Sequence, residues 1–196
     1  MKPILFSTEM VRAILDNRNT QTRRVIKPQP PDDWEPCISD EKYKPKYQVG
    51  DILWVQETWQ FERLDLEREH TIVFRDGEEI TFIFNDEERR EKWFKYIFKS
   101  GWQSPYFMPK EAARIFLKVT DIRVERLQDI SESDAIKEGV KMTQDERLDF
   151  SYKEGFSFLW DFINAKRERG IYVWERNPWV FVYDFGMTML KTDDFV

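Results

Sequence analysis

The sequence predicts an α+β fold, in which short strands and a few amphipathic helices follow one another along a single domain spanning residues 1–196. Short apolar runs between turn residues indicate strands, and apolar residues that recur every three or four positions indicate helices. Segments rich in proline and glycine separate these elements. With 41% apolar and 16% aromatic residues, the chain can bury one substantial core.

A short helix is predicted near the N-terminus, where Ser7 or Thr8 can cap it. It should end near Asn17 and bury a stripe formed by Met10, Ala13 and Ile14. A longer amphipathic helix is predicted where apolar residues recur at helical spacing, at Phe156, Leu159, Trp160 and Ile163.

Another short helix is predicted in the second half of the chain. Ser131 and Asp134 form a start similar to a capping box, and Gly139 suits the left-handed position that ends many helices. Glu138 would therefore lie on the last turn of this helix.

Strands are predicted from apolar runs that turn residues enclose. Residues 49–51 turn the chain into a short strand at 52–55. Residues 71–74 and 80–84 are rich in strand-forming side chains, and the pair Asp76-Gly77 between them favours a hairpin.

Two further strands are predicted nearer the C-terminus. Within residues 115–124 the two-residue alternation changes phase near Thr120-Asp121, which a β-bulge would explain. Residues 179–185 are apolar on both faces, as expected of a central strand. By contrast, prolines punctuate residues 28–48, which we expect to form a long surface loop without regular structure.

Residues 60–106 are interpreted as an insertion that contains the hairpin and a helix. Asn85 can cap this helix with Glu88 at the reciprocal position. One face of the helix would carry Trp93, Tyr96 and Ile97.

Composition excludes several classes of protein. No apolar run approaches the ~18 residues that a membrane span needs, and the N-terminus does not resemble a signal peptide, so we expect no membrane association and a cytoplasmic location. Cys37 and His70 are the only residues of their kinds, which rules out an internal disulfide and a zinc site of the Cys/His type. No metal and no cofactor is predicted, although carboxylates alone could still form a metal site.

The net charge of −6 argues against indiscriminate coating of nucleic acid. The charge is unevenly distributed, since residues 1–30 hold six Lys and Arg against two acidic residues. This asymmetry marks a candidate anion site, and a solvated basic loop is the alternative.

Separated blocks of sequence then stand in a characteristic order. The blocks are Lys2 to Phe6 through Met10–Leu15 into Thr20–Arg24; Gly50 to Trp59; Met108-Pro109 through Arg114 to Val124–Ile130; Asp134 to Val140; and Asn177 to Tyr183. In this order and spacing they resemble the ASCH domain family of the PUA-like superfamily, in the long form common among phage and prophage proteins. The resemblance implies a small closed β-barrel with helices around it.

The resemblance also implies a cleft between the loop after the first helix and the barrel mouth, of the kind that holds RNA or a single nucleobase. Arginine guanidiniums suit phosphate, and tryptophan rings could stack on a base. For Trp54, inside an apolar run, a core position is the favoured alternative. The implied contact residues are Arg18, Asn19, Thr20, Arg23, Arg24, Glu57 and Trp59.

Some small ASCH proteins are amidohydrolases that remove the acyl group from acetylcytidine with a lysine, a threonine and a glutamate. Mapped here, the threonine falls on Thr22 and the glutamate on Glu138, whereas the lysine falls on Asn19. An amide has no titration near neutrality, and loss of a general base typically costs ~10²- to 10⁴-fold in rate. A second departure is Gln56, where the family usually has arginine.

Binding of RNA or a modified nucleoside is therefore the first functional hypothesis. Hydrolysis of a nucleoside or RNA by Thr22 and Glu138 is the second hypothesis. In the structural alternative, the Thr22 hydroxyl forms a hydrogen bond with nearby backbone in a loop, and Glu138 is an exposed helix residue. A third hypothesis is a phage accessory protein that binds a host protein through residues 60–106. The oligomeric state does not follow from the sequence.

Overall fold

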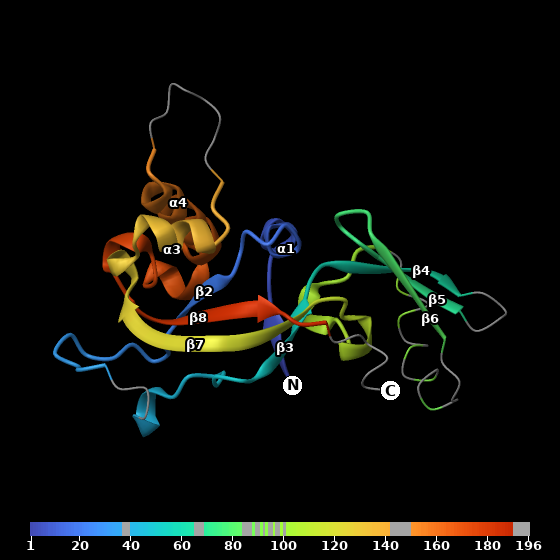
Figure 1. The fold of residues 1–196 in the computed structure, drawn as a ribbon, viewed down its shortest axis with the longest axis horizontal. Helices are drawn as coiled ribbons and strands as arrows, with labels where there is room; N and C mark the ends of the chain where they lie inside the picture. The colour runs from blue at the N-terminus through green and yellow to red at the C-terminus, as the bar shows by residue number, and fades with distance from the viewer. Residues whose placement is uncertain are drawn as a thin grey trace. The chain divides into compact units, whose positions relative to one another are not determined.

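The computed structural model describes residues 1–36, 40–64, 69–83, 101–141 and 150–189, together with residues 88, 91, 93, 96 and 99. The chain combines strands with a few helices, and several strands and helices follow others of their own kind (Figure 1), which confirms the predicted α+β class. Closure of the strands into a barrel stays a prediction. The chain divides into two compact units: unit 1 is Met1–Arg12, Ile52–Leu117 and Met187–Val196, and unit 2 is Ala13–Asp51 and Lys118–Gly186.

Unit 1 contains two groups of strands. Strand β1 (Lys2–Leu5) pairs in parallel with β3 (Ile52–Gln56), and β3 matches the strand predicted at 52–55. Strands β4 (Trp59–Leu64), β5 (Glu69–Phe74) and β6 (Glu79–Ile83) form an antiparallel sheet in that order.

The predicted hairpin is confirmed as β5 and β6, and Gly77 takes the positive φ of 93° that its turn requires. Strand β4, which the sequence pattern did not predict, extends this hairpin to three strands. Trp93 and Tyr96 are helical and buried, as expected of the inserted helix. Asn85 and Ile97 lie outside the described residues.

The core of unit 1 is strongly aromatic. The hairpin contributes Phe74, and the ring of Trp59 packs edge-to-face against Trp93 and Tyr96 at centroid distances of 6.0 and 5.0 Å. Trp54 belongs to the same core, as the core interpretation of this residue predicted. Edge-to-face pairs add to the free energy of apolar burial.

Unit 2 is built on β7 (Phe116–Arg126), β8 (Trp179–Met187) and β2 (Gln21–Val25), in that order. Strand β8 is central and largely buried, as predicted, and it pairs antiparallel with β2 from Gln21↔Asp184 to Val25↔Val180. Along β7 two successive exposed residues, Thr120 and Asp121, mark the predicted change of phase.

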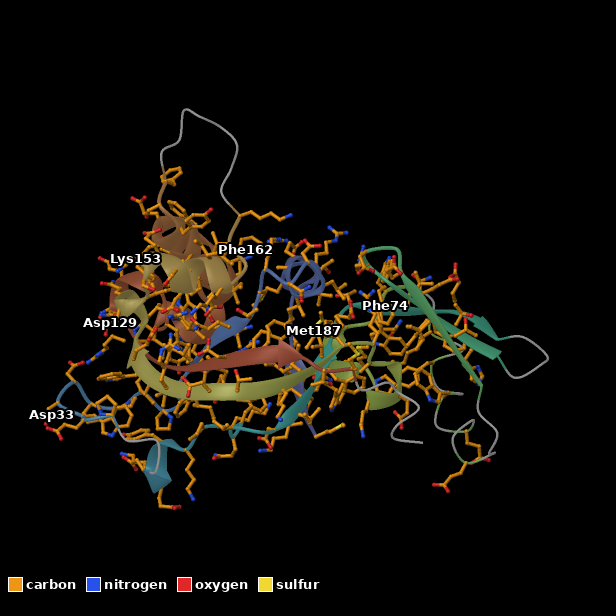
Figure 2. The ribbon with its side chains drawn as sticks, viewed as in Figure 1. Asp33, Phe74, Asp129, Lys153, Phe162 and Met187 are labelled. Carbon is orange, nitrogen blue, oxygen red and sulfur yellow. The ribbon has the colours of Figure 1, made fainter. Side chains whose placement is uncertain are left out.

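Helices α3 (Glu132–Lys137) and α4 (Tyr152–Asn164) lie beside the strands of unit 2 (Figure 1). Ser131 caps α3 by accepting a hydrogen bond from the Asp134 amide at 3.1 Å, as predicted. A core cluster joins α3 and α4 to the sheet, and it consists of Leu127, Ile130, Ala135, Phe156, Trp160, Val180 and Val182. Phe162, outside the predicted apolar stripe of α4, is 88% exposed (Figure 2).

Helix α1 (Thr8–Leu15) ends before Asn17, which has a left-handed φ of 56°. Within the described residues there are also short 3₁₀ turns at Glu41–Tyr43, Pro105–Phe107, Lys110–Ala112, Leu127–Asp129 and Trp174–Arg176. A further turn at Arg167–Gly170 contains Glu168 and Arg169 in the left-handed conformation.

The expectation that residues 28–48 form a surface loop without regular structure was wrong in part. The segment contains the 3₁₀ turn at Glu41–Tyr43, and it buries Tyr43 and Tyr47. The ring of Tyr47 packs against Tyr183 of β8 at 5.1 Å. The free energy gained by burying these aromatic rings keeps the segment packed against the protein although it is rich in proline.

Gly139 ends α3 with a φ of +83°, as predicted, and it also has no room for a side chain. A Cβ there would lie 2.9 Å from the Cβ of Ala13 and 3.1 Å from that of Asn19. We expect Gly139→Ala to lower the free energy of unfolding by about 1–3 kcal/mol.

Denaturant unfolding tests this prediction, with Gly50→Ala as the matched control. Gly50 has a φ of +89° and no neighbouring atom within 4 Å of the added Cβ, so it pays the backbone strain without the steric clash. Equal losses in the two variants would show that the close approach at Gly139 contributes nothing.

Candidate functional site

The candidate site lies in unit 2, where the end of α3 meets the segment that leads into β2. Asn19 and Glu138 form an antiparallel bridge, and the Thr20 amide donates to the Lys137 carbonyl at 2.8 Å. The Asn19 side-chain amide also donates to the Glu138 carbonyl at 3.0 Å. Glu138 is thereby fixed beside β2, which is the last strand of its sheet.

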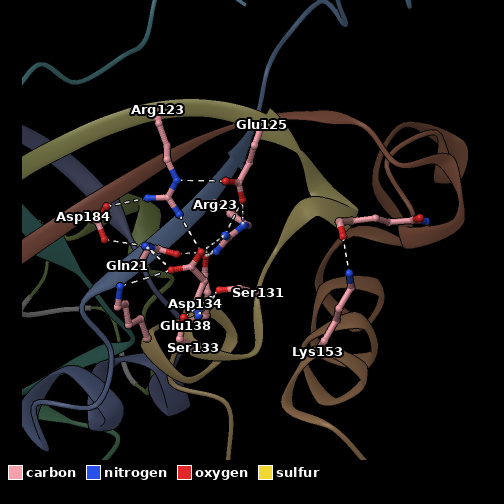
Figure 3. Close-up of polar contacts among 12 residues, drawn as sticks. Gln21, Arg23, Arg123, Glu125, Ser131, Ser133, Asp134, Glu138, Lys153 and Asp184 are labelled. Carbon is pink, nitrogen blue, oxygen red and sulfur yellow. Dashed lines mark hydrogen bonds and ion pairs between the residues drawn. The ribbon is translucent and has the colours of Figure 1, made fainter.

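Arg23 is the central cation of the site, and its side chain is 0% exposed. Its Nη1 donates to Glu138 Oε1 at 2.9 Å, and its Nε and Nη2 donate to Glu125 Oε1 at 2.9 and 2.5 Å. Nη1 also donates to Gln21 Oε1 at 2.7 Å (Figure 3). We call the group formed by Asn19, Arg23 and Glu138 the β2-edge cluster.

A second guanidinium, Arg123, belongs to the same polar network (Figure 3). It donates to Glu125 at 3.1 Å, to Asp134 at 3.1 Å and to Asp184 at 2.9 Å, with 33% of its side chain exposed. Two guanidiniums therefore hold carboxylates from β7, β8 and α3 together. Such buried charges need these partners, because an unpaired buried carboxylate is strongly destabilising.

Burial raises the pKa of Glu138 to about 7, although Arg23 and Arg24 oppose the shift. The carboxyl group therefore exchanges its proton near neutrality, which suits either a hydrogen-bonding or an acid–base role. Burial also acts to raise the pKa of Asp134, but Arg123 and Arg23 outweigh it and hold that pKa below its usual value.

The side-chain oxygen of Asn19 has an unusual environment. Its Oδ1 is buried, and within the described part of the chain it accepts no hydrogen bond. A buried acceptor without a partner costs roughly 1–3 kcal/mol, so such an atom calls for a structural or functional reason.

The other residues predicted for the site in unit 2 are the catalytic candidate Thr22 and the contact residues Arg18, Thr20 and Arg24. Thr22 pairs with Tyr183, so its buried side chain lies on the opposite face of β2 from Arg23. Arg24 shares the Thr22 face, and Thr20 stands at the start of the strand. Arg18 donates to Asp16 at 2.7 Å and to the Gly139 carbonyl at 3.3 Å.

Glu57 and Trp59 lie in unit 1, and each contacts other residues of that unit. Glu57 is buried, accepts two hydrogen bonds from Arg114 at 2.8 and 2.7 Å, and has a pKa that burial raises. Arg114 also bonds Asp76 in the hairpin turn at 2.5 Å. Trp59 has no exposed ring face, so a base could stack on it only after Trp93 and Tyr96 had moved.

Gln56, the second departure from the family pattern, is also in unit 1. Its side-chain amide donates to the backbone carbonyls of Tyr106 and Met108 at 3.3 and 3.4 Å.

Several members of the network were not predicted from the sequence. Asp184 interrupts the apolar run of β8, and Arg123 and Glu125 follow the change of phase in β7. A polar residue inside an otherwise buried strand was the available signal, because such a residue needs a partner. The missed residues are Gln21, Arg123, Glu125, Asp134 and Asp184.

Neither a metal site nor a membrane-spanning helix is present among the described residues. No group of three or more His, Cys, Asp or Glu side chains there is arranged to hold a metal ion. None of the helices in that part of the chain is long and apolar enough to cross a bilayer.

Comparison with known proteins gives one structural likeness. No protein-family model and no curated protein sequence matches the chain. Among solved structures, the chain is similar to a high-resolution crystal structure of an ASCH domain from Lactobacillus crispatus JV V101, with a TM-score of 0.44 and 10% identity. The match covers 95% of this chain and 78% of that chain. This weak overall likeness assigns neither a ligand nor a catalytic residue to the protein.

Proposed function

We propose that the protein is an ASCH-type module that binds RNA or a modified nucleoside, with one base held at the β2-edge cluster. The observation that carries the proposal is the buried Asn19 Oδ1, which has no partner among the described residues and lies beside Glu138. Asn19 and Glu138 are only 2% and 4% exposed, so the residues that cover them would have to move to admit a base, whose exocyclic amino group would then supply the missing donor. The sequence blocks that resemble the ASCH family support the same class of ligand.

Glu138 extends the range of bases that the cluster would accept. With a pKa of about 7, its carboxyl group is close to an equal mixture of acceptor and donor forms at neutral pH. It would accept from an amino group when ionised and donate to a ring nitrogen when protonated. Arg23, whose donors are already engaged by Glu125 and Glu138, would position this carboxyl group. Arg18 and Arg24 remain the proposed phosphate contacts of this segment.

Isothermal titration with cytidine, acetylcytidine and a 12-nucleotide single-stranded RNA tests the proposal. Asn19→Ala removes the unpartnered acceptor, and we expect it to weaken nucleoside binding by about tenfold, the equivalent of one good hydrogen bond. Gln48→Ala, a change at an exposed side chain of the same unit, should leave binding unaltered. Unchanged affinity in Asn19→Ala, with its folding verified, would rule out a base at this position.

A second function, amidohydrolysis of an acylated nucleoside, is favoured by the pKa of Glu138 alone. A carboxyl group that titrates near 7 is matched to general acid–base catalysis at neutral pH. Asn19 stands where the resembling amidohydrolases have lysine, and Thr22 lies across β2 from Arg23.

Incubation with acetylcytidine followed by mass analysis separates the two functions. Release of cytidine that is lost in Thr22→Ala and retained in Thr22→Ser would establish the enzyme. Binding of acetylcytidine without release of cytidine would support the binding module instead of the enzyme. The predicted protein partner of residues 60–106 is a separate proposal, and part of that segment lies outside the described residues.

A further inference from the structure

We infer that a basic loop after α4 binds the phosphodiester backbone of a single-stranded RNA whose base is held at the β2-edge cluster. We call Lys166, Arg167 and Arg169 the cationic loop. The inference rests on the proposed function and names its substrate class: a phosphate-bearing RNA strand instead of a free nucleoside.

The cationic loop is held against the end of β2. Lys27, two residues beyond β2, forms an ion pair with Glu168 and lies 4.6 Å from the centre of the Tyr172 ring. The Tyr172 hydroxyl donates to Glu168 at 2.7 Å, and Trp160 of α4 donates to the Tyr172 carbonyl at 2.6 Å. These contacts connect the loop to both β2 and α4.

The backbone of the loop takes an uncommon conformation. Glu168 and Arg169 have left-handed φ angles of 44° and 59°, and Gly170 follows with 77°. Non-glycine residues are strained in this conformation, and the contacts of Glu168 with Lys27 and Tyr172 hold the loop in it. The cations on either side of Glu168 are therefore presented on an ordered turn.

The charges of the loop are left uncompensated. Its single acidic residue, Glu168, is already engaged by Lys27 and Tyr172. Lys166, Arg167 and Arg169 are exposed and form no ion pair with any described residue. Arg167 has one long hydrogen bond, 3.4 Å, to Asn164 Oδ1. A phosphate group would supply the negative charge that this surface lacks, and guanidinium groups bind phosphate with two parallel hydrogen bonds.

Arg24 connects the loop to the strand that carries the β2-edge cluster. Burial lowers the pKa of Arg24, and the positive charge of Arg167 acts in the same direction. An anion bound by Arg167 would offset this unfavourable effect of its positive charge on Arg24. The carboxyl group of Glu138, which also acts on Arg24, belongs to the β2-edge cluster.

Cations just beyond a helix C-terminus also interact favourably with the helix dipole. This alternative changes stability and leaves RNA affinity untouched. The experiment must therefore measure unfolding and binding in the same variants.

The test compares the double variant Arg167→Gln, Arg169→Gln with the control Lys44→Gln, Lys118→Gln, which removes the same charge from exposed positions beside the Glu41–Tyr43 turn and on β7. A fluorescent 12-nucleotide RNA is titrated at several salt concentrations, and cytidine is titrated in parallel. We expect the loop variant to lose about tenfold in RNA affinity at low salt. The slope of log affinity against log salt should fall by about 1.4, since each phosphate contact on a single strand contributes roughly 0.7.

Cytidine affinity should stay unchanged in the loop variant. Equal effects of the two double variants, or an unchanged salt slope in the loop variant, would overturn the inference while leaving nucleoside binding in place. RNA binding that depends on the loop, in a protein that does not bind cytidine, would support the loop and refute base recognition at the β2-edge cluster. If the native chain bound neither the RNA nor cytidine, both the inference about the cationic loop and the proposed base site would be refuted.

Discussion

Replacing Arg23 by methionine should lower the free energy of unfolding by about 3–5 kcal/mol, the cost typical of breaking a buried ion pair from one side. The side chain is fully enclosed, and it provides hydrogen bonds to Glu125 and Glu138. Methionine fills much of the same volume, so the loss would come from carboxylates left without a counter-charge, not from a cavity. Denaturant unfolding at pH 8, above the pKa of about 7 of Glu138, measures the effect.

Arg123→Met is the matched control for this prediction. Arg123 also bonds Glu125, and it contacts Asp134 and Asp184, but a third of its side chain is exposed. Solvent screens its ion pairs, so we expect a loss of about 1 kcal/mol or less. If the two variants lose equal free energy of unfolding, burial does not strengthen the ion pairs of Arg23, and Arg23 is not the central cation of the site.

Glu138→Gln should remove a pH dependence of stability that the native chain shows between about pH 4.5 and 7. The folded-state pKa of about 7 lies above the ordinary value of 4.5, so in this window the folded state binds more protons than the unfolded state. Stability from this group is therefore complete below pH 4.5 and is lost as the pH rises toward 7. The shift corresponds to roughly 3 kcal/mol.

The measurement is the free energy of unfolding of native and Glu138→Gln protein at intervals from pH 4.5 to 8. The difference between the two chains isolates Glu138, because the other acidic groups titrate in both. Relative to the variant, the native protein should become steadily less stable as the pH rises through this range. A difference that is constant with pH would mean that Glu138 titrates at its ordinary value and is not buried as described.

Much of the fold could be predicted because its signals are local. The cap at Ser131 and the left-handed Gly139 depend on a few neighbouring residues, and the structure confirms both. The turn at Asp76-Gly77 and the apolar run of β8 are equally local. Strand β4 was missed because its alternation is short: Trp59 and Phe61 alternate with polar residues, and the register then shifts between Phe61 and Arg63.

The candidate site could be predicted only in part, because its geometry depends on contacts between residues far apart in sequence. Arg23 was assigned to phosphate from its charge, yet strand register places it among Glu125, Asp134 and Glu138. The basic residues near β2 therefore differ in availability, and that difference arises from tertiary packing. Similarly, Glu138 looked like an exposed helix residue in one reading, but the bridge to Asn19 buries it.

Mass spectrometry of what copurifies with the protein tests the proposed base site most directly. Native protein and the Asn19→Ala variant would be purified side by side, denatured and analysed for nucleosides and nucleotides. We predict that the native chain retains such a compound and that the variant retains much less. Equal amounts in both, or none in a native chain that also fails to bind cytidine and RNA, would contradict a base site formed by Asn19 and Glu138.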